Sequence, residues 1–160
     1  MDNRSAVNSL FQSIASQLGF QVTLGENNLC NIKRKSTGEE TIIELPNNDE
    51  TLYIYAVIGD VPFANREKFF EYVLKLNLHG NGTGKGIIGI DMQTNKFILS
   101  RPFPIKSLDD GLLLQSIGEF FSTVSQLKEK LVHFNQIQTS KNSVAIPDGQ
   151  PLTPNLNFII

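Results

Sequence analysis

The stretch KFFEYVLKLNLHGNGTGKGIIGID, residues 68–91, decides the fold of this chain. Its first half has apolar residues at helical spacing, its middle is rich in glycine, and its last residues, GIIGID (86–91), are typical of a strand. The part GKGIIG, Gly84 to Gly89, also matches the fingerprint G-x-G-x-x-G of dinucleotide-binding proteins. The order of the elements around the glycines decides between a nucleotide site and a structural turn.

The nucleotide interpretation fails because the helix lies on the wrong side of the glycines. Phosphate binds at the free N–H groups of a helix N-terminus, so the fingerprint needs a strand before the glycines and a helix after them. Here the predicted helix comes first and the strand follows. The P-loop pattern G-x-x-x-x-G-K-[ST] fails too, because His79 stands where its first glycine belongs and Gly86 follows Lys85. A nucleotide enzyme is therefore the weakest of the alternatives.

The glycines have structural explanations. Gly80 is well placed as the left-handed cap that ends the preceding helix. Gly82 and Gly84 are interpreted as a flexible connector. Gly86 and Gly89 lie in the strand itself, where glycine indicates a bulge or the close approach of another backbone.

Working outward, the hydrophobic pattern predicts the order α-β-β-β-α-β-β-α, with one additional strand after the first helix. Short connections between the strands favour an antiparallel meander over β-α-β crossovers. We therefore expect an α+β fold with an antiparallel sheet of about five or six strands and three helices. The predicted helices are 5–18, capped by Asn3 or Ser5 and ended by Gly19, then 66–78, capped by Asn65, and 110–134. The predicted strands are 20–24, 29–33, 41–45, 51–59 (the central one), 86–91 and 96–103.

The composition is that of one globular domain. The chain has 160 residues, of which 40% are hydrophobic and 19% charged. A net charge of −2 and a pI of about 5.7 argue against nucleic-acid binding. The basic triplet Lys33-Arg34-Lys35 is explained better as a solvated strand end than as a phosphate site. We place the domain at residues 1–135 and a mostly irregular, proline-containing tail at 136–160.

The sequence offers no catalytic constellation. Cys30 is the only cysteine, which excludes an intrachain disulfide and a multi-cysteine metal site. The two histidines lack metal-binding spacing, and no G-x-S-x-G elbow occurs. Asp109 and Asp110 are interpreted as a helix cap. We predict no enzyme, no metal and no cofactor. The N-terminus lacks a signal-peptide pattern and no apolar run could span a bilayer, so we expect a soluble cytoplasmic protein.

Three segments carry a resemblance to a known family. LYIYAVIGDVP (52–62), residues 68–91 and KFILSRPFPIKSLDD (96–110), followed by a long apolar helix, resemble class I chaperones of bacterial type III secretion systems, the Tir chaperone-like family. The resemblance covers residues 5 to about 134 and rests on pattern and spacing. A longer tail and a richer glycine run depart from the family, and some members with Pro- and Gly-rich tails act on several effectors, so a multi-cargo role is open.

The resemblance implies a twisted sheet, a cytoplasmic homodimer and a non-catalytic function. Such chaperones hold an extended segment near the N-terminus of a secreted effector and present it to the secretion apparatus, whose ATPase or sorting platform is a further candidate partner. No nucleic acid and no membrane insertion are implied. The alternative is a generic α/β interaction or sensor domain that is unrelated to secretion.

Two sets of apolar residues are candidate sites. An extended segment needs a strand edge and apolar pockets for alternate side chains, and each cargo candidate is also a candidate core residue. The cargo candidates are Phe11, Ile14, Leu18, Leu29, Ile32, Ile43 and Leu45. Helix 66–78 has apolar residues on more than one face, which indicates a second partner such as another subunit. The dimer candidates are Phe69, Phe70, Val73, Leu74, Ile87, Ile88 and Ile90. We also hypothesise that Phe158–Ile160 folds back into the cargo groove.

Overall fold

The computed structural model describes residues 2–19 and 21–143. The elements run in the order expected from the sequence. They are α1 (Asn3–Leu18), β1 (Leu29–Lys33), β2 (Glu40–Glu44), β3 (Thr51–Asp60), α2 (Arg66–Asn77), the 3-10 turn η1 (Leu78–Gly80), β4 (Ile87–Asp91), β5 (Lys96–Pro104), the 3-10 turn η2 (Ile105–Ser107) and α3 (Asp110–Ser143). This arrangement confirms the α+β class.

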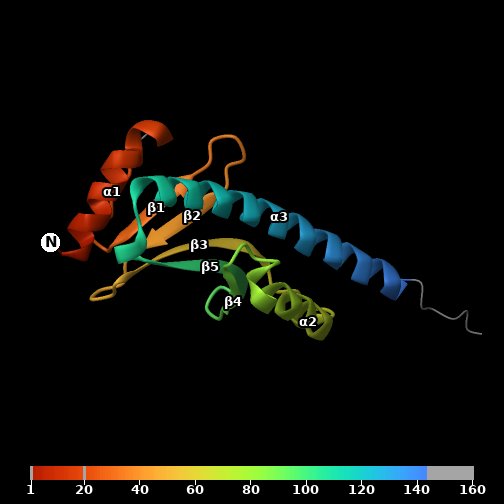
Figure 1. The fold of residues 1–160 in the computed structure, drawn as a ribbon. Coiled ribbons are helices and arrows are strands. Elements are labelled where there is room, and N and C mark those ends of the chain that lie inside the picture. Colours follow the sequence, from red (N-terminus) through yellow and green to blue (C-terminus); the bar gives the residue numbers. More distant parts are fainter. Residues whose placement is uncertain (1, 20, 144–160) are drawn as a thin grey trace, which may run out of the picture.

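The strands form one antiparallel sheet in the order β1-β2-β3-β5-β4 (Figure 1). The longest strand, β3, lies in the middle and pairs with β2 and β5, as its continuous apolar sequence predicts. Its register with β5 shifts between Val57 and Gly59, which marks a bulge. The edge strands β1 and β4 have five residues each.

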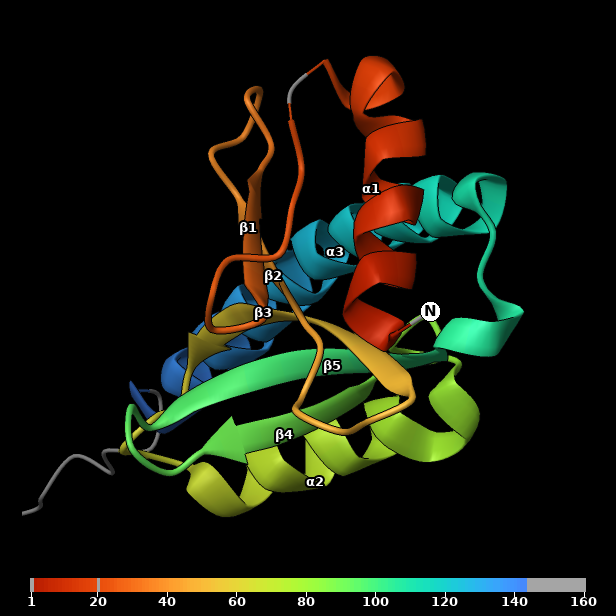
Figure 2. The same ribbon diagram turned by 90° about the vertical axis from the view of Figure 1, so that its left-hand side faces the viewer.

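The helices build the core on one face of the sheet. Figures 1 and 2 show α1 and α3 crossing that face, with α2 lying beside β4. From α3, Leu113, Val124 and Leu127 are fully buried, as their helical spacing predicts. Phe69 of α2 stacks on Phe97 of β5, with ring centroids 5.9 Å apart. This face is therefore closed by the chain itself.

The ends of α1 differ partly from the expectation. Asp2, and not Asn3 or Ser5, is the N-cap, because its carboxylate accepts a hydrogen bond of 2.7 Å from the Ser5 N–H. Aspartate is among the preferred residues at this position. Gly19 ends the helix as predicted, with a φ of 75° and its N–H donated to the Ala15 carbonyl.

The glycine run is a packed turn. Gly80 has the expected left-handed conformation, with a φ of 67°. It is not the cap of α2, however, because that helix ends at Asn77 and Leu78 follows as its C-cap in an extended conformation. The expected flexible connector is wrong, because a Cβ on Gly82 would lie 2.8 Å from the Leu76 carbonyl oxygen and one on Gly84 would lie 2.7 Å from the Thr123 hydroxyl. The chain needs glycine here because neighbouring atoms leave no room for a side chain.

Two expected boundaries are wrong. The predicted strand 20–24 is not assigned as a strand over its described residues 21–24, where the Leu24 N–H donates instead to the Asn8 side chain of α1. Helix α3 continues to Ser143, well beyond residue 134.

The extension of α3 has a packing reason. The Phe134 ring stacks on Tyr72 of α2 at 4.3 Å, and Gln138 one turn further is buried. Residues 136–143 of the predicted tail are therefore helical. The division at residue 135 stays a prediction, and Phe158–Ile160 lie outside the described residues.

Candidate functional site

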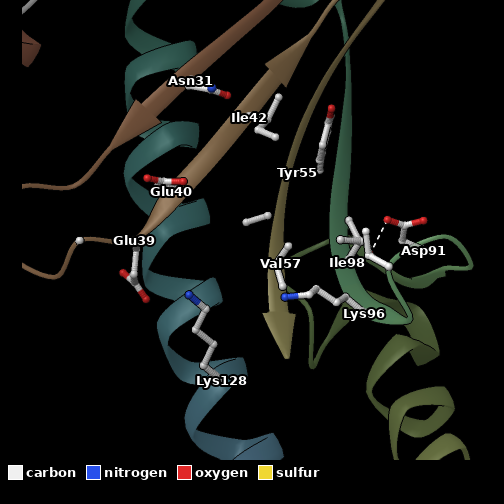
Figure 3. Close-up of a pocket in the computed structure, with 13 residues that line it drawn as sticks. Asn31, Glu39, Glu40, Ile42, Tyr55, Val57, Asp91, Lys96, Ile98 and Lys128 are labelled. Atoms are coloured by element: carbon white, nitrogen blue, oxygen red, sulfur yellow. Dashed lines mark hydrogen bonds between the residues drawn. The ribbon is translucent and has the colours of Figure 1, made fainter. Parts of the chain in front are cut away.

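The sheet face opposite the helices carries a second apolar surface. Strand residues alternate between the two faces, so β3 points Leu52 and Ile54 into the core and Tyr53, Tyr55 and Val57 to the other side. The register places Ile42 of β2 beside Tyr55. In Figure 3 this outer face is turned toward the viewer and α3 passes behind the strands.

A groove of about 590 Å³ lies on this outer face. Its floor is apolar and comes from three neighbouring strands, namely Ile42 of β2, Tyr55 and Val57 of β3, and Ile98 of β5 (Figure 3). We call it the outer groove; its full lining is Asn31, Gly38, Glu39, Glu40, Ile42, Tyr55, Ala56, Val57, Asp91, Thr94, Lys96, Ile98 and Lys128. A row of apolar side chains across strands is suited to the side chains of an extended peptide.

A second hollow of about 340 Å³ continues the groove toward β4. The two hollows share Asp91 and Ile98. In the second one, Tyr53 and Ile87 supply apolar walls, and a Cβ on Gly89 would meet no atom within 4 Å. The backbone of β4 is therefore accessible at Gly89. No other part of the described chain makes the close approach that was predicted for this glycine, so the space is available to a partner.

The charges around the outer groove are mostly neutralised within the chain. Lys33 pairs with Glu40 at 3.1 Å, Arg34 with Glu39 at 3.5 Å, and Lys96 with Asp60 at 3.7 Å. The lining residue Lys128 of α3 has no ion pair among residues 2–19 and 21–143. One cation is thus left at the groove wall for a carboxylate of a partner.

Tyr55 is the lining residue with the most perturbed titration. Burial, a hydrogen bond with Glu44 and the charge of that carboxylate together raise its pKa to about 12, and burial is the largest of the three causes. The phenol stays protonated at neutral pH and offers an amphipathic surface, as tyrosine does at many interfaces.

The outer edge of β1 presents backbone groups. Arg34 and Glu39 continue the ladder with β2 through an Arg34 N–H bond to the Glu39 carbonyl. In an antiparallel ladder the groups of alternate residues point away from the neighbouring strand. The N–H and C=O groups of Asn31 and Lys33 therefore point outward, beside the outer groove.

Most of the expected cargo residues belong to the core of the chain itself. The structure buries Phe11, Ile14, Ile32, Ile43 and Leu45, while Leu18 and Leu29 are half-buried. All five belong to the hydrophobic core of the chain, so they do not form pockets that cargo could reach. The outer groove was missed, although the run TLYIYAVI, apolar at odd and even positions alike, is a signal that both faces of β3 carry apolar side chains.

The expected dimer residues divide between core and surface. Phe69, Val73 and Ile88 are buried within the chain, and Phe70 is half-buried. The other three are exposed, and so are two residues that the sequence analysis did not single out. The exposed set, here called the α2–β4 set, is Leu74, Leu78, Ile87, Ile90 and Met92.

The described residues include no cluster of potential metal ligands beside these surfaces. Within the part of the chain that the structure describes, no three His, Cys, Asp or Glu side chains gather into a possible metal site. Cys30 is buried, and burial raises the pKa of its thiol. In the same residues no helix has the length and hydrophobicity needed to cross a membrane.

The domain is therefore an antiparallel sheet with three helices on one side and an open apolar groove on the other. The model of the Tir chaperone protein (CesT) family matches residues 9–128, three quarters of the chain. The chain belongs to this family. The family predicted from the sequence is thus confirmed, and membership supports the predicted role as an effector-binding secretion chaperone.

Solved structures show the same fold. The ExsC–ExsE complex matches with a TM-score of 0.70 at 19% identity, covering 82% of this chain and 97% of that chain. The HopA1–SchA chaperone–effector complex matches with a TM-score of 0.67 at 13% identity, and the match covers 81% of this chain and 98% of that chain. The heterodimeric ExoU–SpcU complex from the type III secretion system of Pseudomonas aeruginosa matches with a TM-score of 0.56 at 13% identity. That match covers 79% of this chain and 94% of that chain. A search of the curated proteins gave no match.

Proposed function

We propose that this chain is a non-catalytic chaperone that binds an extended N-terminal segment of one or more type III effectors, keeps it competent for secretion and delivers it to the secretion apparatus. The outer groove is the observation that carries the proposal, because it offers an apolar surface that the chain itself leaves open. Similar folds occur in complexes whose names describe a chaperone with its effector and a heterodimer from a type III secretion system.

The geometry suits an extended segment better than a small molecule. The floor residues Ile42, Tyr55 and Ile98 come from adjacent strands and form a row about as wide as three strands, with strands spaced about 4.8 Å apart. The groove is open along one side, whereas small-molecule sites enclose most of their ligand. A segment lying there would place apolar side chains on the floor, and a carboxylate on it would reach Lys128.

The edge of β1 adds a place for backbone pairing. Its outward groups at Asn31 and Lys33 lie beside the groove, so a segment could pair with β1 and continue onto the outer face. Leu18 and Leu29, half-buried in the chain, remain the cargo candidates from the first set that a partner could reach. Ordering a disordered segment costs entropy, so a long contact is needed.

The functional form we propose is a homodimer in the bacterial cytoplasm. The α2–β4 set supplies exposed apolar side chains, and a symmetric contact would use the same residues of both copies. Delivery would bring the dimer to the secretion ATPase or the sorting platform. Sedimentation velocity tests the dimer, because a stable monomer at micromolar concentration would exclude it.

Co-expression with an N-terminal effector segment tests the proposed function. The chaperone should keep an otherwise insoluble segment in solution. Val57→Asp places a charge on the groove floor and should abolish this effect, while Val132→Asp on α3 should retain it; the two valines are 42% and 58% exposed. Equal behaviour of the two variants would rule out the groove. A protein that solubilises no effector segment and binds only folded partners would favour the interaction-domain alternative.

A further inference from the structure

The other edge of the sheet is closed by a side chain. Asn77, the last residue of α2, accepts a hydrogen bond of 2.8 Å from the Ile88 N–H and donates one of 3.0 Å to the Ile88 carbonyl. Ile88 is a residue of the edge strand β4. The Asn77 amide thus makes with Ile88 the two bonds that a residue of a neighbouring strand would make.

The direction of these bonds shows which backbone groups β4 presents at its edge. Since the Ile88 groups point to Asn77, those of Ile87 and Gly89 point toward β5. Ile90, two residues after Ile88, points its groups the same way as Ile88. Within this strand of five residues only Ile88 and Ile90 have outward groups, and the Asn77 amide occupies those of Ile88.

We propose that Asn77 is a specificity-determining residue that closes the β4 edge, so that this side of the protein meets a second copy of the chain only through side chains and not through strand pairing. The inference rests on the proposed chaperone dimer, whose α2–β4 set lies on the same elements. An open edge is a template for other strands. With β4 closed, β1 is the edge that remains for an extended segment.

The consequence of opening β4 follows from the geometry. A chain with both β1 and β4 available could pair its β4 with the β1 of the next copy. Such a head-to-tail contact does not close on itself and produces open-ended assemblies. Closure of one edge therefore keeps the number of copies fixed while the other edge stays available for cargo.

The substitution Asn77→Ala tests this proposal, with Asn81→Ala, an exposed asparagine in the following turn, as the matched control. Sedimentation velocity over a range of concentrations should show one discrete species for the native protein and the control. Asn77→Ala should show a concentration-dependent series of larger species with an infrared signal of intermolecular β-structure. Adding Gly89→Lys should restore the discrete species, because a charged lysine on an edge strand opposes pairing. A Cβ at Gly89 meets no atom within 4 Å, so the backbone there has room for a side chain.

Hydrogen exchange gives a measurement that does not depend on a variant's folding. In the native protein the Ile88 amide should exchange about tenfold more slowly than the outward Ile90 amide. Equal rates would overturn the proposal, as would an Asn77→Ala protein that folds and keeps the native size at every concentration. Solubilisation of the effector segment by the native protein is measured separately. If the edge closure is refuted, the proposed function is unaffected. If the native protein solubilises no effector segment, the size and exchange measurements still test the edge closure.

Discussion

The Ser125 hydroxyl of α3 donates to the carboxylate of Glu39, 2.9 Å from each oxygen, across 86 residues of sequence. Glu39 stands before β2 and also pairs with Arg34, whose guanidinium lies 4.7 Å from the centre of the Phe121 ring. These contacts fasten the turn between β1 and β2 to α3. They hold in place a wall of the outer groove, since Glu39 lines it.

Ser125→Ala should lower the free energy of unfolding by on the order of 1–2 kcal/mol, because the half-buried Glu39 carboxylate loses a charged hydrogen bond. Ser122→Ala is the control, since the hydroxyl of that exposed serine on the same helix donates to the Gly118 carbonyl and to no other group among the described residues. Urea unfolding followed by circular dichroism measures both. Equal stabilities of the two variants would show that the Glu39 contact contributes nothing.

Two buried threonines should respond to valine in opposite directions. Both are 1% exposed, but the Thr41 hydroxyl has no partner among the described residues, while the Thr83 hydroxyl donates to the Gly86 carbonyl at 2.5 Å. Thr41→Val should raise the melting temperature by removing an unpaired buried polar group, an effect of about 1 kcal/mol. Thr83→Val should lower it. Calorimetry measures the two shifts, and a shift of the same sign in both variants would contradict the prediction.

Cys30 should be slow to react with thiol reagents in the native protein. Burial is the larger cause that raises its thiol pKa, against a smaller opposing hydrogen bond from the Thr23 backbone. A raised pKa reduces the thiolate fraction, and the thiolate is the reactive form. Ellman's reagent at pH 8 should modify Cys30 quickly only after unfolding. A Ser13→Cys, Cys30→Ser double variant, with its thiol on the exposed face of α1, should react at once; equal native rates would refute burial as the controlling factor.

The ionisation of Tyr55 should make stability depend on pH above pH 10. The folded pKa of about 12 lies above the ordinary value of 10. The folded state then holds its proton where the unfolded state has lost it, so the contribution is fully present below pH 10 and is lost as pH rises toward 12. Chemical unfolding at pH 9, 10 and 11 measures the slope.

Two variants assign this slope to Tyr55. Tyr55→Phe should make it shallower. Glu44→Gln should lower the phenol pKa toward 10, because the carboxylate contributes to the shift. An unchanged slope in Tyr55→Phe would assign the dependence to other groups.

Helices and strands with a regular hydrophobic spacing were predictable, because residues at that spacing lie on the same buried face of the element. In α3 the spacing of Leu113, Val124 and Leu127 found the helix, and the chain-wide order of helices and strands led to the family. The end of α3 was not predictable in this way, because it depends on Tyr72 and Phe134 stacking between two helices. The segment 21–24 alternates like a strand but gives its Leu24 N–H to Asn8.

The candidate site was less predictable than the fold. Hydrophobicity marks residues that leave water but does not distinguish burial in the chain from burial by a partner. Phe11 and Ile43 were therefore grouped with cargo residues, although α1 and the sheet enclose them. Tyr55, Val57 and Ile98 had the same apolar character, and only the absence of a helix above their face made them a surface.

The sequence by itself determined the class, the element order and the family, because these depend on local periods, glycine positions and short connections along the chain. Tertiary structure alone decided which apolar side chains stay accessible. It also brought together residue pairs that cannot be predicted from their spacing in the sequence, such as Ser125 with Glu39 and Asn77 with Ile88. Such contacts depend on how the elements are placed in three dimensions, and that placement is a property of the whole packed chain.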